Sequence, residues 1–201
     1  MLNRVPILIG ISGNRGSGKD TSFSYIEKWA NENNVLAVRR AFADPLKFSF
    51  ARIFFSEITL EDAIIWCNKI KENSIINAGD GVAVTGRQAL QHYGLEAHRE
   101  LFGENFWLDL VLPKENWQEK IGEADICVIT DVRLDNEAQR IKELGGVIWK
   151  INRKLDTVDE HATEQGLPTE LVDIHVMNIN FHDLEIQISS LMNAICERNN
   201  A

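Results

Sequence analysis

Cysteine and proline are scarce in this sequence, and it has neither a long hydrophobic run nor an excess of positive charge. The three cysteines, Cys67, Cys127 and Cys196, are too widely spaced for a disulfide framework or a CxxC zinc site, and such usage is typical of a reducing cytoplasm. No apolar segment approaches the ~20 residues that cross a bilayer, and the N-terminus lacks a signal-peptide cleavage site, so no membrane association is expected. The formal net charge of −9 argues against a general nucleic-acid binder, although a locally positive pocket for a small anion is compatible with it.

The length and hydrophobic content of the chain are sufficient for one α/β domain with an insertion. The chain has 201 residues, 44% of them hydrophobic, which is enough to bury a core without cross-links. Apolar, β-branched runs without clean alternation are separated by helical patterns, which predicts a parallel sheet covered on both faces. Strands are expected at 5–11, 35–42, 125–130, 147–151 and 173–178. Helices are expected at 19–33, 45–55, 60–72 (with Thr59 as N-cap), 86–102, 105–121 (broken at Pro113), 135–144 and 183–198.

The strongest signal is a glycine-rich loop between the first strand and the first helix. It reads Gly13-Asn14-Arg15-Gly16-Ser17-Gly18-Lys19-Asp20-Thr21. Glycines let such a loop wrap a phosphate with its backbone N–H groups, the helix N-terminus adds partial positive charge, and the lysine reaches the outer phosphates. The alternative, a plain turn before a helix, is disfavoured by the strand–loop–helix context. The loop therefore predicts a nucleoside triphosphate site.

The residue after the loop lysine departs from the usual pattern. Asp20 stands where Ser or Thr would hold magnesium, so Asp20 itself, directly or through water, or the hydroxyl of Thr21 is the expected ligand. Among enzymes with this loop, GTPases need an NKxD motif, which is absent here, and ring ATPases need a larger module. A small kinase, which brings two phosphates together under a lid, fits the length and the helical insertion better.

The chain as a whole resembles a known family, the phage-type deoxynucleoside monophosphate kinases of the P-loop nucleoside monophosphate kinase superfamily. The matching segments are Ile11–Thr21, with Asp20 part of the resemblance; Phe42–Lys47; Gly86–Gln91 with Gly94, Arg99, Gly103 and Trp107; Ile129–Arg133 with Asn136 and Glu137; Gly145–Gly146; and Arg153, His161, Glu164 and Asp173–Asn178. The resemblance covers most of the chain in the right order, whereas residues 59–84 carry no family motif.

The resemblance implies a fold and a reaction. The fold is a three-layer P-loop kinase domain over 1–201, with a five-stranded parallel sheet of order 2-3-1-4-5, a helical acceptor-binding insertion at 59–121 and a lid at 152–168. The reaction is phosphoryl transfer from ATP to a (deoxy)nucleoside monophosphate, giving the diphosphate and ADP, with Mg²⁺ as cofactor. Nucleotides are then the partners, and the cytoplasm, of the host if the chain is phage-encoded, is the expected location.

Candidate residues for the transfer itself lie at strand ends. Asp131 follows the third strand, where an acidic residue supports magnesium, and Arg133 beside it can bridge donor and acceptor phosphates. Their alternatives are a turn residue and a surface charge. Arg153 begins the polar loop 152–168 and is the candidate lid arginine, whereas His161 and Glu164 are candidates only for ordering that loop. Lys19, Asp131, Arg133 and Arg153 form the predicted catalytic set.

Candidate residues for the acceptor are Asp44, Lys47, Arg87, Gln91, Arg99, Trp107 and Thr130. Asp44 and Lys47 follow the second strand, at the sheet edge where parallel sheets bind ligands, but they could equally open a helix. Arg87 and Arg99 offer guanidinium forks for a phosphate, against the alternative of a solvated helix face. On an ideal helix they point about 120° apart, so convergence requires a bend or break, for which Gly94 is the candidate. Gln91 could bond a base edge, and Trp107 could stack on the base or belong to the core.

Two rival functions stay open at this stage. One is a P-loop kinase for another small phosphorylated metabolite, which would differ only in the acceptor pocket. The other is a nucleotide-sensing module, which would bind ATP without transferring its phosphate. The sequence leaves base preference, sugar selectivity and the choice between monomer and homodimer undecided.

Overall fold

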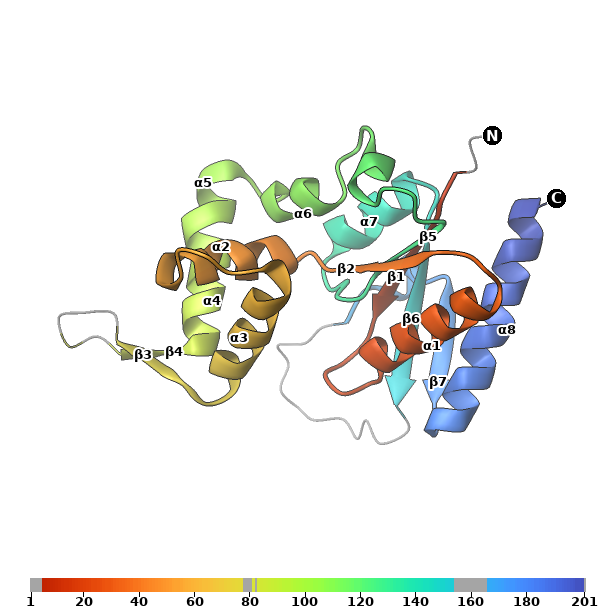
Figure 1. The fold of residues 1–201 in the computed structure, drawn as a ribbon, viewed down its shortest axis with the longest axis horizontal. Helices are drawn as coiled ribbons and strands as arrows, with labels where there is room; N and C mark the ends of the chain where they lie inside the picture. Colours follow the sequence, from red (N-terminus) through yellow and green to blue (C-terminus); the bar gives the residue numbers. More distant parts are fainter. Residues whose placement is uncertain (1–4, 78–80, 82, 154–165, 201) are drawn as a thin grey trace. The chain divides into compact units, whose positions relative to one another are not determined.

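The computed structural model describes residues 5–77, 81, 83–153 and 166–200. The chain divides into two compact units (Figure 1): a sheet unit, Met1–Ala41 with Lys114–Ala201, and a helical unit, Phe42–Pro113. In the described residues, no helix is both long enough and apolar enough to cross a membrane.

The sheet unit is built on five parallel strands, β1 (Ile7–Ser12), β2 (Ala37–Arg40), β5 (Ile126–Ile129), β6 (Val147–Arg153) and β7 (Ile174–Asn178). Their order across the sheet is β2-β5-β1-β6-β7. In chain order this is 2-3-1-4-5, so the predicted topology is confirmed. Because β1 is central, the loop that follows it lies at the middle of the carboxyl edge of the sheet.

Helices cover both faces of this sheet, which completes the three layers (Figure 1). On one face, Ile9 and Ile11 of β1 are fully buried in a cluster with side chains of α1 (Lys19–Glu32) and α8 (Phe181–Asn200). On the other face, the Cβ position of Gly10 lies 2.7 Å from Ile141 Cδ1 of α7 (Asp135–Glu143). Successive residues of a strand point to opposite faces, so the apolar run of β1 serves both helical layers.

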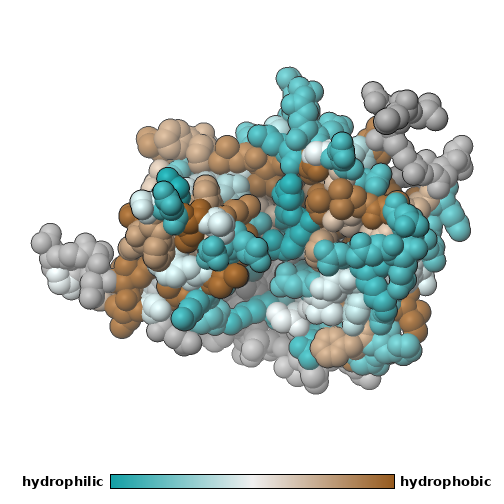
Figure 2. Space-filling view, in the orientation of Figure 1, coloured by the Kyte–Doolittle hydropathy of each residue, from teal (hydrophilic) through white to brown (hydrophobic). Residues whose placement is uncertain are grey.

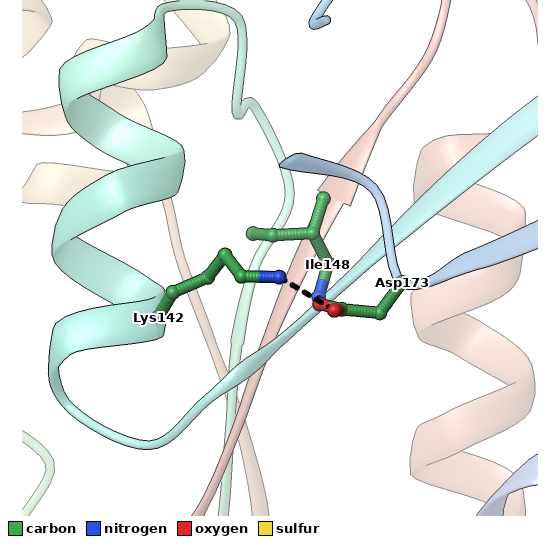
Figure 3. Close-up of polar contacts among 3 residues, drawn as sticks. All are labelled: Lys142, Ile148 and Asp173. Atoms are coloured by element: carbon green, nitrogen blue, oxygen red, sulfur yellow. Dashed lines mark hydrogen bonds and ion pairs between the residues drawn. The ribbon is translucent and has the colours of Figure 1, made fainter. Parts of the chain in front are cut away.

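Asp173 joins α7 to the neighbouring strands β6 and β7 (Figure 3). Its Oδ2 accepts a 2.8 Å hydrogen bond from the Ile148 N–H of β6, and its Oδ1 lies 2.5 Å from Lys142 Nζ in the last turn of α7. The Asp173 N–H in turn donates to Ile148 O at 2.9 Å. Asp173 therefore extends the β6–β7 hydrogen bonding by one residue before the start of β7.

Replacing Asp173 with alanine is expected to lower the free energy of unfolding by about 1–2 kcal/mol, because the partly buried Ile148 N–H loses its acceptor. The melting temperature would fall by roughly 2–8 °C for a chain of this length. Lys142→Ala is the matched control, since it removes only the half-exposed ion pair, which is worth at most about 1 kcal/mol. Calorimetry measures both, and a larger loss in Lys142→Ala than in Asp173→Ala would contradict this assignment.

The helical unit contains α2 (Asp44–Phe54), α3 (Leu60–Asn73), α4 (Gly86–Gly94), the π-helix η1 (Leu95–Arg99), α5 (Glu100–Phe102) and α6 (Phe106–Val111). Thr59 is the N-cap of α3, as predicted, and accepts a hydrogen bond from the Asp62 N–H. Thr85 and Gln88 form a reciprocal capping box that starts α4. A core of Phe50, Ala51, Ala63, Cys67, Ile70 and Leu90 holds α2, α3 and α4 together.

Three predicted elements of the chain's middle differ in the structure. The expected helix 86–102 changes from α to π winding after Gly94. The expected helix 105–121 is interrupted around Pro113, as predicted, because proline cannot continue a helix, but its two pieces are short: α6 and a 3₁₀ turn, Trp117–Lys120. Between the expected helices 60–72 and 86–102, where no strand is expected, the structure has two short antiparallel strands, β3 (Ile75–Asn77) and β4 (Ala83–Thr85), which are too short to show alternation in the sequence.

Hydrophobic side chains reach the surface of the helical unit on the face drawn in Figure 2. The large apolar residues exposed on this unit include Ile53, Phe54, Phe55, Leu60, Ile65, Leu101 and Phe102. Trp66, which is half-buried, packs against Phe54 and Phe55 with ring centroids 5.2 and 5.1 Å apart.

Burial makes two of the three cysteines poor nucleophiles. It raises the pKa of the Cys67 thiol to about 11 and that of Cys127 to about 12, although the charges of Lys47 and Arg40 respectively oppose the shift. Both thiols stay protonated at neutral pH, and only a thiolate attacks. Cys67 and Cys127 therefore serve as small core residues.

Candidate active site

The phosphate-loop segment 13–18 connects β1 to α1 at the carboxyl edge of the sheet. Its three glycines, Gly13, Gly16 and Gly18, have φ values of 145°, 76° and 107°, which side-chain-bearing residues rarely adopt. The Ser17 N–H donates to Asn14 O at 3.1 Å and closes a turn inside the loop. Lys19 is the first residue of α1, so its ammonium extends from the positive end of the helix.

The carbonyls of this loop are held by side-chain donors. Lys19 Nζ donates to Gly13 O at 2.7 Å and to Asn14 O at 2.8 Å. Arg153 Nη1, at the end of β6, donates to Gly16 O at 3.1 Å, and Asn178 Nδ2, at the end of β7, donates to Ser17 O at 2.7 Å. A planar trans peptide directs its C=O and N–H to opposite sides, so each held carbonyl also fixes the direction of the next N–H. The loop is thus arranged to present N–H donors to an anion.

The segment after β5 lies at the same edge of the sheet. The Val132 N–H donates to Ile11 O of β1 at 3.2 Å, which ties this segment to the strand that carries the loop. Asp131 is half-buried, Arg133 is exposed, and Thr130 is only 3% exposed. Among the described residues, the Thr130 hydroxyl has no hydrogen-bond partner.

The backbone that follows Asp131 is fixed by the helix after it. Glu137, buried in the first turn of α7, accepts hydrogen bonds from the Arg133 N–H at 2.8 Å and the Leu134 N–H at 3.1 Å. A carboxylate at this position satisfies two N–H groups that the helix itself cannot. Glu137 thereby sets where the Arg133 side chain starts, and its first-turn position agrees with the sequence prediction.

Oxygen ligands suitable for magnesium come from two segments of the sheet unit. Asp20 and Thr21 are in the first turn of α1, exposed and half-buried respectively, and Asp131 follows β5. The described part of the chain holds no group of three His, Cys, Asp or Glu side chains that could bind a metal by themselves. Magnesium usually takes one or two carboxylates together with substrate phosphates and water, so this donor set fits it.

In the helical unit, Asp44 and Lys47 form a mostly buried ion pair, with Lys47 Nζ 3.8 Å from Asp44 Oδ1 and side chains 13% and 10% exposed. Arg87 Nη2 lies 3.6 Å from Glu72 Oε1, and both of these side chains are substantially exposed. Gln91, one turn after Arg87 on α4, is exposed as well. Arg87 and Gln91 are accessible from solvent, whereas Lys47 is held against Asp44.

The helix that carries Arg87 and Arg99 changes its winding between them. The α-helix ends at Gly94, the residue where the sequence analysis places a break, and Arg99 is the last residue of the π-helix. A π turn holds more residues than an α turn, so each residue rotates by less than the ~100° of an α-helix. Rotation therefore accumulates more slowly, which moves Arg99 toward the helix face of Arg87.

Trp107 stabilises this change of winding. It is 3% exposed, and its Nε1 donates to Gly94 O at 3.0 Å across the α–π junction. Its ring packs against His98 of the π-helix and Phe106, with centroids 4.7 and 4.8 Å apart. Of the two alternatives from the sequence, this geometry is that of a core residue.

The predicted lid 152–168 lies mainly outside the described residues, which exclude 154–165 and with them His161 and Glu164. The first two residues of the predicted lid, Asn152 and Arg153, are the last two residues of β6. At its far end Leu167 is 3% exposed. The Arg153 contact with Gly16 O brings the start of this segment to the phosphate loop.

Asn178 is the site residue that sequence reasoning missed as a functional group. The sequence pattern places Asn178 only in the last strand, and its partner Ser17 is 161 residues away. The one signal in the sequence was a polar residue at the carboxyl end of a predicted strand, where parallel sheets place ligands.

The comparisons with known proteins agree on one family. The family model for deoxynucleotide monophosphate kinase matches residues 54–188, which include the segment after β5 and the ends of β6 and β7. The "Putative deoxynucleotide monophosphate kinase" of Acanthamoeba polyphaga mimivirus is 30% identical over 177 residues, 80% of this chain and 82% of that protein. The deoxynucleoside-5'-monophosphate kinase of Escherichia phage T5 is 24% identical over 249 residues, 90% of this chain and 98% of that protein.

A third relative matches a shorter stretch. The deoxynucleotide monophosphate kinase of Escherichia phage RB69 is 30% identical over 94 residues, 46% of this chain and 38% of that protein. Together with the phosphate loop and the strand order, these matches confirm the resemblance found in the sequence. The chain belongs to the deoxynucleotide monophosphate kinase family and is a P-loop kinase.

Proposed function

We propose that this chain transfers the γ-phosphoryl group of ATP to a deoxynucleoside monophosphate, giving the diphosphate and ADP. The observation that carries the proposal is the loop 13–18 before α1, whose carbonyls are held by the side chains of Lys19, Arg153 and Asn178, so that peptide N–H groups such as that of Gly18 point away from these donors. Family membership supports the acceptor class.

The chain's own groups supply positioning and charge. Residues 13–21, from Gly13 to Thr21, hold the ATP phosphates, and Lys19 exchanges the carbonyls of Gly13 and Asn14 for phosphate oxygens. Arg133 and Arg153 neutralise the charge of the transferring group. A monophosphate is already ionised at neutral pH, so no strong general base is required, and catalysis is mainly alignment and charge stabilisation.

Magnesium belongs to the proposal on the strength of the donor set. Asp20 or Thr21 and Asp131 would hold it, directly or through water. When bound, it neutralises charge on the β- and γ-phosphates.

The helical unit supplies the acceptor groups in this proposal. Arg87, Arg99 and Lys47 bind the monophosphate, Gln91 bonds the base edge, and Asp44 orients Lys47 through their ion pair. Trp107 acts by holding the α–π junction before Arg99, and Thr130 adds a buried hydroxyl at the sheet edge. The segment 59–121 would be the acceptor-binding insertion of a single kinase domain, 1–201, and 152–168 its lid.

The cytoplasm is the proposed location, in the infected host if a phage encodes the chain. Cys67, Cys127 and Cys196, all in the described part of the chain, form no disulfide, which agrees with a reducing compartment.

A coupled assay of ADP release across the four common deoxynucleoside monophosphates, their ribose counterparts and several phosphorylated sugars tests the proposal. Transfer to at least one deoxynucleoside monophosphate, well above the phosphorylated sugars, is expected. Transfer only to other phosphorylated metabolites would overturn the acceptor class. Saturable ATP binding without transfer to any acceptor would indicate a nucleotide-sensing module instead.

Arg87→Ala is expected to raise the KM for the monophosphate roughly 10- to 100-fold, because one charge-assisted contact to phosphate is lost. The KM for ATP should change less than twofold. The fold should tolerate the change, since the Glu72 pair is exposed and contributes little. Arg52→Ala, an exposed arginine of α2, is the matched control and should leave both constants unchanged. A raised KM for ATP with an unaltered monophosphate KM would instead place Arg87 at the donor site.

A further inference from the structure

Lys19, Arg153 and Asn178 hold carbonyls of the phosphate loop, and of these side chains that of Asn178 is neutral and buried. Asn178, the last residue of β7, is 6% exposed, and its Nδ2 lies 2.7 Å from Ser17 O. The same nitrogen lies 2.5 Å from the Cβ position of Gly18, so the Asn178 amide fills the space that a side chain at residue 18 would need. The loop is therefore fitted closely to this one side chain.

The other two donors differ from Asn178 in charge. Lys19 and Arg153 are cations on long, flexible stems, and both are proposed to move to the phosphates when ATP binds. Asn178 is the register neighbour of Arg153 in the β6–β7 pair, yet it has no charge for the phosphates to attract. Its short side chain and its burial also leave it little freedom to move. It is the donor that can stay on the loop throughout the reaction.

We infer that Asn178 is a positioning residue for the ATP site, acting through the Ser17–Gly18 peptide. Asn178 holds the Ser17 carbonyl on the β7 side, and peptide planarity then directs the Gly18 N–H away from β7. Gly18 is the residue directly before α1, so this N–H joins the first donors of the helix at the anion site. A neutral donor fixes the loop without competing for the charge of the phosphates. The inference rests on the proposed function for the identity of the ligand.

The test compares Asn178→Ala, which removes the donor, with Asn178→Asp, which keeps the shape but replaces the N–H₂ with an acceptor. Asn193→Ala is the matched control, because Asn193 also makes one partly buried side-chain bond, with Trp29 Nε1 at 2.8 Å, away from the loop. Both Asn178 variants are expected to lower kcat/KM for ATP about 10- to 100-fold, because a small displacement of the loop N–H groups misaligns the ATP phosphates. The KM for the monophosphate should stay within twofold in all three variants.

A merely structural role predicts a different pattern. If Asn178→Ala and Asn193→Ala lower the melting temperature to a similar degree and only the former raises the KM for ATP, positioning is supported. An unchanged KM for ATP in Asn178→Ala, or an equal rise in Asn193→Ala, overturns the inference. Asn178→Asp decides the matter should the alanine variant not fold.

A readout without ATP separates this inference from the proposed function. The Ser17 N–H, bonded to Asn14 O, should exchange with solvent about tenfold faster in nucleotide-free Asn178→Ala than in the unaltered chain, because the loop loses an anchor. Equal exchange overturns the inference. An unaltered chain that transfers no phosphate from ATP overturns the proposed function, and faster Ser17 exchange in Asn178→Ala would still support the anchoring of the loop.

Discussion

Replacing Lys19 with alanine is expected to lower kcat for phosphoryl transfer about 10²- to 10³-fold. This side chain supplies a positive charge at the junction of loop and helix, and the loss of one preorganised group at a charged transition state typically has this effect. The free energy of unfolding should fall by no more than about 2 kcal/mol, since the hydrogen bonds that are lost, such as those to Gly13 O and Asn14 O, lie in a surface loop. Steady-state kinetics and thermal unfolding measure the two quantities.

Lys28→Ala is the matched control for this prediction. Lys28 lies in the middle of the same helix, nine residues after Lys19, and pairs with Glu185 of α8 at 2.6 Å on the surface. Its loss should leave kcat within twofold of the unaltered chain. Near-normal turnover in Lys19→Ala would show that the loop 13–18 is not the catalytic phosphate site.

Gly13→Ala is expected to reduce kcat/KM for ATP more than 100-fold and to destabilise the sheet unit. The alanine Cβ would lie 2.5 Å from Ile151 O and 2.6 Å from Ser17 Oγ. Ile151 belongs to β6 and is the register partner of Val176 in β7, so its carbonyl cannot move away without disturbing the sheet. The φ of 145° adds strain of about 1–3 kcal/mol for a residue with a side chain.

Relief of this clash requires the loop to move, and displacement of phosphate-binding groups by about 1 Å can lower the rate 10²-fold. Gly145→Ala is the matched control, since Gly145 also has a positive φ, 81°, but no atom within 4 Å of its Cβ position, and it lies after α7. It should lower the melting temperature while preserving activity. Gly13→Ala with kinetics like those of Gly145→Ala would mean that the loop tolerates displacement.

The sequence by itself determined the elements that depend on local signals. The apolar β-branched runs located all five strands of the main sheet to within a few residues, because a strand buried on both faces needs apolar side chains throughout. Thr59 identified the start of α3, because an N-cap hydroxyl acts on an N–H only three residues away. The glycines and Lys19 identified the phosphate loop, because each has a conformational or electrostatic role that few other residues fill. The order of the strands came from the family resemblance rather than from these patterns.

The tertiary structure decided the features that depend on partners distant in the chain. Asn178 acquires its role only because β7 ends beside a loop 161 residues earlier. The π-helix that ends at Arg99 is stabilised by Trp107, whose indole N–H bonds Gly94 O, and helix propensity contains no signal for such a bond. The β3–β4 hairpin is too short to produce a period-two pattern. In each case the decisive interaction forms only after the chain has folded, so local propensity and periodicity could not identify it.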